Sequence, residues 1–414
     1  MSSTIWYSIA MRPGCLALVL LILLSGGATA VTKDGAGWAV HYNLPDQDTR
    51  HATSKNAHEY VIRDVMLRRI KALKRGNHAT LATFTLSGGS DCCGAAGPIL
   101  RAVDKALDRG ASVAFVTSSH IDPLKKLGTY SLQDLTSRKS NPLKHYQDRS
   151  HRGIMHHKLG LFDYGLGKRW VVVMSWNFTG GASSQQWNIA VELKNEKAYR
   201  IYEKEMEEFA AGRFHDHPEK SHKHDGSFTI SGGWGKSDVR FAPYVSSRSG
   251  GNNAATDILK AIRSAKKEIV FALNRFTVQE IAEALVNATR RGVRVRGVVP
   301  NGDTTGKGSS RQVVAYLKKQ AARTKGDGVQ LLVASSRGDG STLDAGERDL
   351  VHTKYMVIDP TSARPLVIHG SANWTASALI FTDKNDENVC FFRHRGMARA
   401  FLDHFNKLTR TSSR

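Results

Sequence analysis

The sequence of 414 residues predicts an α/β protein made of two similar halves. Three observations support this prediction. Expected strands alternate with helices in both halves, the order of these elements repeats, and one pattern of histidine, lysine and aspartate occurs in each half at the same spacing. Helical connections between strands require a parallel or mixed sheet that is covered on both faces. Two such halves suggest a molecule with a pseudo-twofold axis.

The first thirty residues are expected to be a signal peptide (1–30) that is separate from the fold. Arg12 precedes the apolar run 15–24, and the following "SGGATA" ends in the small residues Ala28 and Ala30. A run this short before an A-x-A site is typical of a secretory signal rather than of a membrane-spanning helix. We therefore expect a secreted protein cleaved near Ala30, with an uncleaved N-terminal anchor as the alternative. No later stretch is long and apolar enough to span a bilayer, so no transmembrane span is expected after cleavage.

The first repeat, residues 31–213, shows the alternation clearly. Apolar residues at helical spacing from Val61 to Leu73 predict its first helix. The expected elements are a helix over 59–76, a strand over 78–87, a helix over 95–110, a strand over 111–119 and a closing helix over 197–212. Gly110 is a typical helix stop. The basic segment 120–150 is expected to be a loop beside a site.

The second repeat, residues 234–414, follows the same order. The expected elements are a helix over 254–265, a strand over 267–276, a helix over 278–292, a strand over 293–301 and a closing helix over 397–408. Residues 301–311 are expected to be a second loop beside the site. Between the repeats, residues 214–233 are polar and rich in glycine and histidine. We interpret this segment as a solvated linker rather than a metal site, because no carboxylate or cysteine framework accompanies its histidines.

One motif occurs twice, with a histidine, one residue, a lysine, four residues and an aspartate. Its copies are His156, Lys158 and Asp163 in "IMHHKLGLFDYG" (154–165), and His352, Lys354 and Asp359 in "VHTKYMVIDP" (351–360). Each copy is followed at the same distances by a serine and an asparagine: Ser175 and Asn177 in "SWNFT", and Ser371 and Asn373 in "SANWT". On a strand, residues two apart face the same way, so His156 and Lys158 project together while His157 points to the other face.

The two sets would form one pocket if they meet across the pseudo-twofold axis. A phosphodiester suits such a pocket, because lysines and asparagines can hold its non-bridging oxygens and stabilise charge in the transition state. The residues expected to bind the phosphate are Asn177, Asn373, Ser175 and Ser371. One imidazole would attack phosphorus, and the opposite imidazolium would protonate the leaving oxygen. No metal and no cofactor is expected, since the lysines supply the positive charge.

At these residues the chain resembles the phospholipase D superfamily, whose signature is a duplicated HxKxxxxD motif followed by a GSxN-like segment. The resemblance covers both repeats and is most specific at "HHKLGLFD", "HTKYMVID" and "HGSANWT". It implies a bilobed α/β/α sandwich with the site between the repeats. It also implies that His156 is the nucleophile, that His352 is the acid and base, and that Asp163 and Asp359 are structural.

The resemblance further implies an acid that hydrogen-bonds a motif histidine. In the second repeat, Glu387 in "NDENVCFF" (385–392) matches this acid. In the first repeat, Trp187 or Asn188 falls at the equivalent place, depending on the gap, and Glu192 is too far along the strand. The supporting residues are therefore expected to be Asp163, Asp359, Glu387 and Asn188, and the two histidines are expected to lie in unequal electrostatic settings.

Net charge and cysteine count limit the possible partners. The formal net charge is +22, and removing Arg12 with the signal lowers it to +21. This charge favours a polyanionic partner, either a phospholipid membrane surface or nucleic acid. The three cysteines that remain, Cys92, Cys93 and Cys390, do not make a disulfide framework, although either neighbour could pair with Cys390.

Three functions fit these features. The first is a secreted phospholipase D that hydrolyses the head-group phosphodiester of phospholipids through a phosphohistidine. The second is a metal-independent extracellular endonuclease of the same superfamily, and the third is a non-catalytic polyanion-binding protein. Two complete sets of histidine, lysine and asparagine disfavour the third. A single chain that carries both motifs is expected to act as a monomer.

Overall fold

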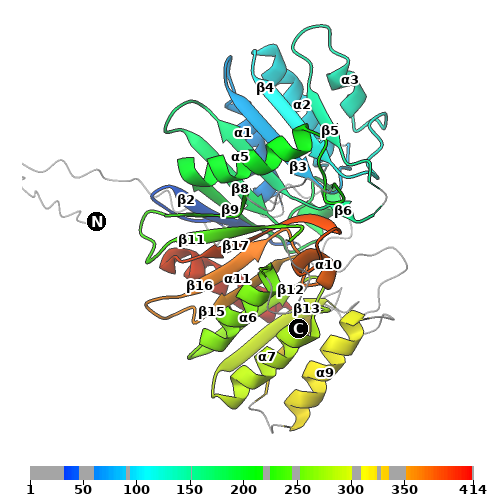
Figure 1. The fold of residues 1–414 in the computed structure, drawn as a ribbon. Coiled ribbons are helices and arrows are strands. Elements are labelled where there is room, and N and C mark those ends of the chain that lie inside the picture. Colours follow the sequence, from blue (N-terminus) through cyan, green and yellow to red (C-terminus); the bar gives the residue numbers. More distant parts are fainter. Residues whose placement is uncertain are drawn as a thin grey trace, which may run out of the picture. The chain divides into compact units, whose positions relative to one another are not determined.

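The computed structural model describes residues 32–45, 60–89, 94–150, 152–217, 224–244, 252–300, 309–323, 328–334 and 351–412. The chain from Val31 to Arg414 is one compact unit that contains both repeats (Figure 1). The expected signal peptide, Cys92, Cys93 and most of the expected loop 301–311 lie outside the described residues. Among the described helices, none is long and apolar enough to cross a bilayer.

The first repeat forms an eight-stranded mixed sheet in the order β1-β2-β9-β8-β7-β3-β4-β5. Its strands are β1 (Thr32–Gly35), β2 (Trp38–Tyr42), β3 (His78–Thr83), β4 (Ser112–Thr117), β5 (Lys144–Gln147), β7 (Leu159–Asp163), β8 (Arg169–Met174) and β9 (Ile189–Lys194). Neighbours β3, β4 and β5 are parallel, because helical crossovers connect them, whereas the others pair antiparallel.

The second repeat forms a sheet in the order β10-β11-β17-β16-β15-β12-β13-β14. Its strands are β10 (Gly226–Phe228), β11 (Ser237–Ala242), β12 (Glu268–Leu273), β13 (Arg294–Pro300), β14 (Gln330–Ala334), β15 (Lys354–Ile358), β16 (Leu366–Gly370) and β17 (Asn385–Phe392). Every strand has its equivalent at the same place in the first sheet. The short strand β6 (Ile154–Met155) of the first repeat pairs with β17 of the second.

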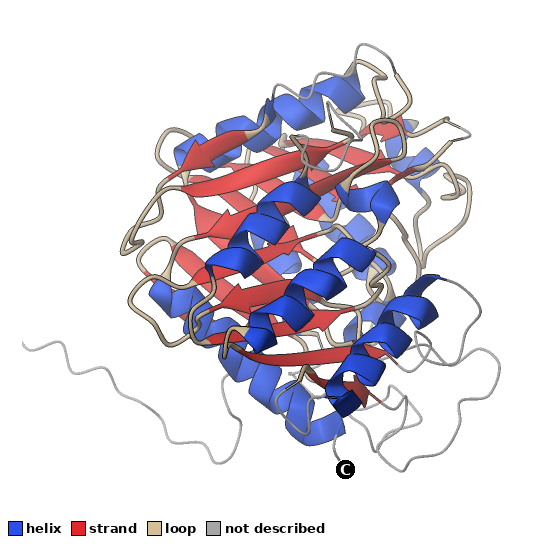
Figure 2. Cartoon of the chain, turned by 60° about the horizontal axis from the view of Figure 1, so that its bottom comes forward, coloured by secondary structure: helices blue, strands red, loops and turns tan. Residues whose placement is uncertain are grey.

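Helices cover both faces of each sheet, as Figure 2 shows. In the first repeat they are α1 (Val61–Lys71), α2 (Ala96–Asp108), α3 (Leu132–Thr136), α4 (Gly180–Ser184) and α5 (Glu196–Ala210). In the second repeat they are α6 (Ala254–Ser264), α7 (Gln279–Arg290), α9 (Ser309–Arg323), α10 (Ala376–Leu379) and α11 (Arg395–Ser412). After α2 and α7 the chain turns through Gly110 and Gly292, both at a φ of 82°, where a side chain would be strained.

The inner strands supply apolar residues to two cores at once. In β8, Val171 and Val173 belong to the core that also contains α5 and α11, whereas Val172 belongs to the core under α1 and α2. In β15, Tyr355 joins the first of these cores, and Met356 joins a third core under α6 and α7. Successive strand residues face opposite sides, so a strand covered on both faces must be apolar throughout.

The predicted α/β fold of two related repeats is confirmed. Two segments differ from what we expected of them. The basic segment 120–150 contains α3 and β5 as well as loops. The segment expected to be a solvated linker contains β10, and its His215 is only 2% exposed because the ring is enclosed beside Asp386. Its His224 pairs with Glu208 of α5.

Candidate active site

Each motif begins where its strand meets the other repeat. The backbone N–H of His156 donates to the carbonyl of Asp386 on β17 at 3.0 Å. The backbone N–H of His352 donates to the carbonyl of Trp187, just before β9, at 3.1 Å. Because β17 and β9 are equivalent strands of opposite repeats, these reciprocal bonds bring the two motifs together. The fold therefore produces the convergence that the duplicated motif requires.

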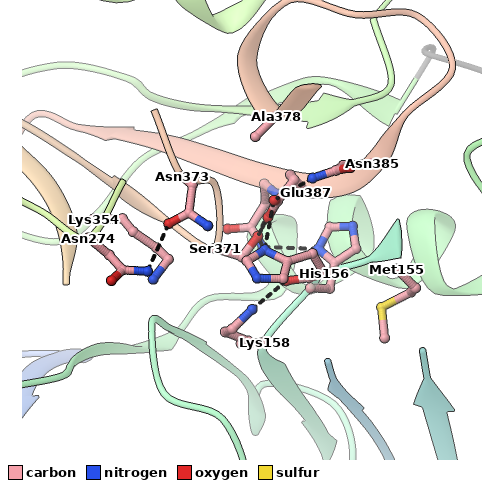
Figure 3. A network of polar contacts seen from close by, with 12 residues as sticks. Met155, His156, Lys158, Asn274, Lys354, Ser371, Asn373, Ala378, Asn385 and Glu387 are labelled. Carbon is pink, nitrogen blue, oxygen red and sulfur yellow. Dashed lines mark hydrogen bonds and ion pairs between the residues drawn. The ribbon is translucent and has the colours of Figure 1, made fainter. Parts of the chain in front are cut away.

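His156 is held by a carboxylate from the second repeat. Its Nδ1 lies 2.7 Å from Glu387 Oε1, and Glu387 Oε2 accepts a hydrogen bond of 2.6 Å from Ser371 Oγ (Figure 3). Asn385 Nδ2 donates to Oε1 at 3.3 Å. A carboxylate at Nδ1 places the proton there and leaves Nε2 as the nitrogen with a lone pair.

His352 is held by an amide from the first repeat. Its Nδ1 lies 3.0 Å from Asn188 Oδ1, which also accepts from Ser175 Oγ at 2.8 Å. Asn188 Nδ2 donates to the carbonyl of Ala182 at 2.9 Å, and this fixes the orientation of the amide. His352 Nδ1 must therefore donate, so this ring also keeps its lone pair on Nε2.

The two motif lysines are buried beside the histidines. Lys158 Nζ donates to the carbonyl of His156 at 2.9 Å, and Lys354 Nζ donates to the carbonyl of His352 at 2.7 Å. Burial lowers the pKa of Lys158 to about 7, although the Glu387 charge opposes the shift. Burial and the charge of Lys158 lower the pKa of Lys354 well below its usual value.

Burial, followed by the charges of both lysines, also holds the pKa values of His156 and His352 well below 6.5. Four groups that can carry a positive charge thus lie near the Glu387 carboxylate. A bound anion such as a phosphodiester would offset their repulsion and favour their protonated forms.

The two motif asparagines differ in their contacts. Asn177 is 8% exposed, and within the described residues its buried Oδ1 has no hydrogen-bond partner. Asn373 is half-buried, and its Oδ1 accepts from Asn274 Nδ2 at 3.4 Å. The strands β8 and β16 run antiparallel to β7 and β15 and end opposite Lys158 and Lys354. Each asparagine follows the end of its strand by three residues, on the side of the sheet where the motif lysines lie at the starts of their strands.

Two of the residues expected at the phosphate have a different position. The hydroxyls of Ser175 and Ser371 are fully buried and donate to Asn188 and Glu387. They therefore lie behind the histidine partners and orient them, rather than facing a phosphate. Each motif serine points toward the segment that carries the histidine partner. The spacing of serine and asparagine alone did not reveal this.

The motif aspartates lie away from the histidines, at the other ends of β7 and β15. Asp163 pairs with Arg169 and accepts from the backbone N–H of Gly165. Asp359 accepts from the backbone N–H groups of Lys266, Lys267 and Glu268. Asp359 also lines a pocket of about 780 Å³ that no motif histidine or lysine lines. Both carboxylates therefore fix turns.

Sequence reasoning missed three neighbours of the site. The Phe84 ring lies 4.7 Å from the His156 ring, and Lys158 Nζ lies 5.3 Å from the centre of the Phe84 ring. The other two are Asn274 and Asn385, described above. Phe84 follows β3 and Asn274 follows β12, and these are equivalent strands. Phe84 and Asn274 could have been found from their place at the carboxyl ends of predicted inner strands.

The described residues include no group of three or more histidine, cysteine, aspartate or glutamate side chains that could hold a metal ion. Cys390 is buried and free, with its Sγ 3.0 Å from the hydroxyl of Tyr202.

Comparisons with known proteins agree with this duplicated architecture. The family model described as "Cardiolipin synthase, PLD-like domain" matches residues 70–210 and 258–409, one segment in each repeat. The chain is similar to the mitochondrial cardiolipin hydrolases of Canis lupus familiaris, at 25% identity, and Homo sapiens, at 26%, each over 158 residues. These matches cover 38% of this chain and 51% and 52% of the relatives, so they span about half the length of those proteins.

Among solved structures, the fold is similar to that of phosphatidylserine synthase from Haemophilus influenzae Rd KW20. The TM-score is 0.59 at 11% identity, over 86% of this chain and 85% of that one. At this identity the likeness concerns the fold alone.

Proposed function

Because the chain belongs to the phospholipase D-like family of the cardiolipin synthase type, we propose that it is a phosphodiesterase that hydrolyses the head-group phosphodiester of phospholipids. The observation that carries the proposal is the reciprocal pair of half-sites. His156 is hydrogen-bonded through Nδ1 to Glu387 and His352 through Nδ1 to Asn188, so each imidazole has its lone pair on Nε2, and the charges of the same two buried lysines act on both rings.

The chemistry divides into two displacements. His156 Nε2 attacks phosphorus and the bond to the head-group oxygen breaks, while His352, which the bound anion keeps in its imidazolium form, gives that oxygen its Nε2 proton and becomes neutral. Water then gives a proton to His352 and attacks phosphorus, the P–N bond breaks, and phosphatidate leaves. Lys158, Lys354 and the motif asparagines stabilise the charge on the non-bridging oxygens.

The unequal partners support His156 as the nucleophile. Its ring becomes positively charged when phosphorylated, and the adjacent Glu387 carboxylate stabilises that charge. His352 faces a neutral amide, which does little to stabilise its protonated form. It therefore gives up a proton more readily, as a general acid should.

Two observations favour a lipid substrate. The relatives named above are called cardiolipin hydrolases, and the family model is named for cardiolipin synthase. Leu124 is 67% exposed and lies beside the exposed Lys125 and Lys126, in the segment that follows β4. An exposed leucine followed by a lysine suits the surface of an anionic bilayer, and Lys125 would supply this charge because Lys126 is paired with Asp134. Export, with a signal cleaved near Ala30, forms part of the same proposal.

A nuclease is the second candidate, because the formal net charge of +22 would bind a nucleic-acid backbone. One experiment separates the two. The purified protein, in EDTA, is incubated with phosphatidylcholine or cardiolipin vesicles and separately with plasmid DNA. Release of the head group without DNA nicking supports the lipid function. Nicking that declines steeply with added salt would replace it with the nuclease function, and neither product would refute both.

A further inference from the structure

A second polar group lies on the opposite face of β17 from Glu387. Asp386 precedes Glu387 in the strand, so its side chain points the other way. Asp386 Oδ2 lies 2.8 Å from His215 Nδ1 and also accepts from the His215 backbone N–H at 3.2 Å. The other ring nitrogen, His215 Nε2, lies 2.8 Å from Ser150 Oγ. The phosphodiesterase chemistry uses none of these three residues.

The hydrogen bonds define where the protons lie. The Asp386 carboxylate is fully buried and only accepts, so His215 Nδ1 donates to it. In the neutral ring, His215 Nε2 then accepts from the Ser150 hydroxyl. Burial would lower the pKa of His215, but the bond to Asp386 and the charges of Asp386, Asp148 and Asp216 outweigh it and raise that pKa. His215 is therefore a stronger base than an isolated imidazole.

The serine is held in place and lies on a pocket wall. Asp148 Oδ1 accepts from the Ser150 backbone N–H at 2.9 Å, and Asp148 Oδ2 accepts from the Met155 backbone N–H at 3.1 Å. These bonds clamp the turn that carries Ser150. The half-buried Ser150 lines a pocket of about 450 Å³ whose walls include the rings of Phe209 and Phe214.

We propose that Ser150, His215 and Asp386 form a second catalytic site, in which Ser150 is the nucleophile for hydrolysis of small carboxylic esters. Ser150 Oγ attacks the ester carbonyl carbon while His215 Nε2 takes the hydroxyl proton. The C–O bond to the alcohol breaks, and the alcohol leaves with that proton. Water, deprotonated by His215, then attacks the acyl group, the bond to Ser150 breaks with return of the proton, and the carboxylic acid leaves.

The pocket indicates which esters fit. Its volume is at the small end of the range for ligand sites, so it suits a short acyl chain or a single aromatic ring. Tyr146, Phe209 and Phe214 supply apolar contacts, and the exposed Arg149 next to Ser150 supplies positive charge for the oxyanion.

The test uses a fluorophosphonate probe, which phosphonylates an activated serine, and peptide mass spectrometry to locate the label. We expect the label at Ser150. The label should be absent from Ser150→Ala. In His215→Asn the rate of labelling should fall at least about a hundredfold, because the new amide can still donate a hydrogen bond to Asp386 but cannot act as a base. Hydrolysis of p-nitrophenyl butyrate should fall in parallel. Ser118, whose Oγ lies 3.1 Å from His120 Nδ1, is fully buried and should stay unlabelled.

Three controls keep the result interpretable. Thermal unfolding checks that each variant folds, and phospholipid hydrolysis by Ser150→Ala should match the parent protein. His156→Ala should lose phosphodiester cleavage and keep the label, so this proposal and the proposed function fail separately. No label at Ser150, or equal labelling in His215→Asn, would overturn the second site and leave the three residues as a bridge between the repeats.

Discussion

The two motif histidines contact different partners across the repeat boundary. His156 meets the carboxylate of Glu387, whereas His352 meets the amide of Asn188. Glu387 lies on β17 and Asn188 immediately precedes the equivalent strand β9, and both are fixed by a motif serine. Duplication has therefore preserved the geometry of the two half-sites, while one position has changed the electrostatics. A symmetric fold can in this way give two chemically identical side chains different tasks.

The two repeats also differ in the contacts of the residue that follows each motif histidine. Behind His156, the next residue His157 lies 3.3 Å from Glu205 Oε1 and 3.0 Å from Asn388 Nδ2, all fully buried. Behind His352, the next residue is Thr353, whose hydroxyl donates to the carbonyl of Ala272 at 3.3 Å. The first half-site thus rests on a buried charged network and the second on a nearly apolar one.

The largest effect is expected from removing the nucleophile. His156→Ala should lower kcat by about 10⁴-fold or more, because no covalent intermediate can form. His352→Ala should be as inactive on phospholipids. On a diester with a p-nitrophenyl leaving group, which needs no acid, it should release about one equivalent of p-nitrophenol and then stop. A rapid-quench assay measures this burst, and a burst from His156→Ala instead would reverse the two roles.

Exchanging the partners tests whether charge makes the difference. Glu387→Gln keeps the size of the side chain and should lower kcat by about 10²- to 10³-fold, since the phosphorylated ring loses its counter-charge. Asn188→Asp gives His352 a carboxylate and should lower kcat by only about tenfold, because a stabilised imidazolium is a weaker acid. Steady-state kinetics on a short-chain phosphatidylcholine measures both. A Glu387→Gln variant with the kcat of the parent protein would mean that Glu387 acts only by its shape.

The pH dependence of activity should also depend on the ionisation of Glu387. Burial raises the pKa of Glu387 to about 7, with Lys158 opposing, so the carboxyl becomes ionised above that pH. Burial lowers the pKa of Lys158 to about 7, so this amine loses its charge above that pH. Because activity needs both charges, kcat/KM should be bell-shaped with a maximum near neutrality. Glu387→Gln should remove the acidic limb and keep the alkaline one, and an unchanged acidic limb would assign that limb to another group.

The sequence revealed those parts of the site that repeat at fixed spacing. The motif histidines and lysines could be found because their strands recur at equivalent places, and the period of two on a strand separates His156 from His157. The sequence left Trp187 and Asn188 as alternatives for the partner of the second histidine, because a shift of one residue moves a side chain to the other face of a strand. In the structure, Asn188 Oδ1 is the atom that lies 3.0 Å from His352 Nδ1.

Contacts between distant segments could not be predicted. His156 and Glu387 are separated by 231 positions, and nothing local in either segment indicates that each motif is completed by the opposite repeat. The Ser150, His215 and Asp386 group likewise joins three segments, one of which was expected to be a linker. The short strands β1, β2, β10 and β11 were also missed, because they gain stability from pairing rather than from local pattern: β2 pairs with β9 and β11 with β17, and β1 and β10 pair with β2 and β11.

The smallest effect on activity is expected from replacing His157. This variant should lose stability but keep its turnover, and it therefore separates the two kinds of effect. His157→Ala leaves Glu205 and Asn388 without two buried hydrogen bonds, which should lower the free energy of unfolding by about 1–3 kcal/mol. Thr353→Ala, the equivalent change in the second repeat, should cost about 1 kcal/mol or less, since it removes one long bond to a carbonyl. Urea unfolding measures both changes, and kcat of each folded variant should stay within a fewfold of the parent protein. If His157→Ala abolished turnover while unfolding at the same urea concentration as the parent, the assignment of His156 rather than its neighbour to the reacting face would be wrong.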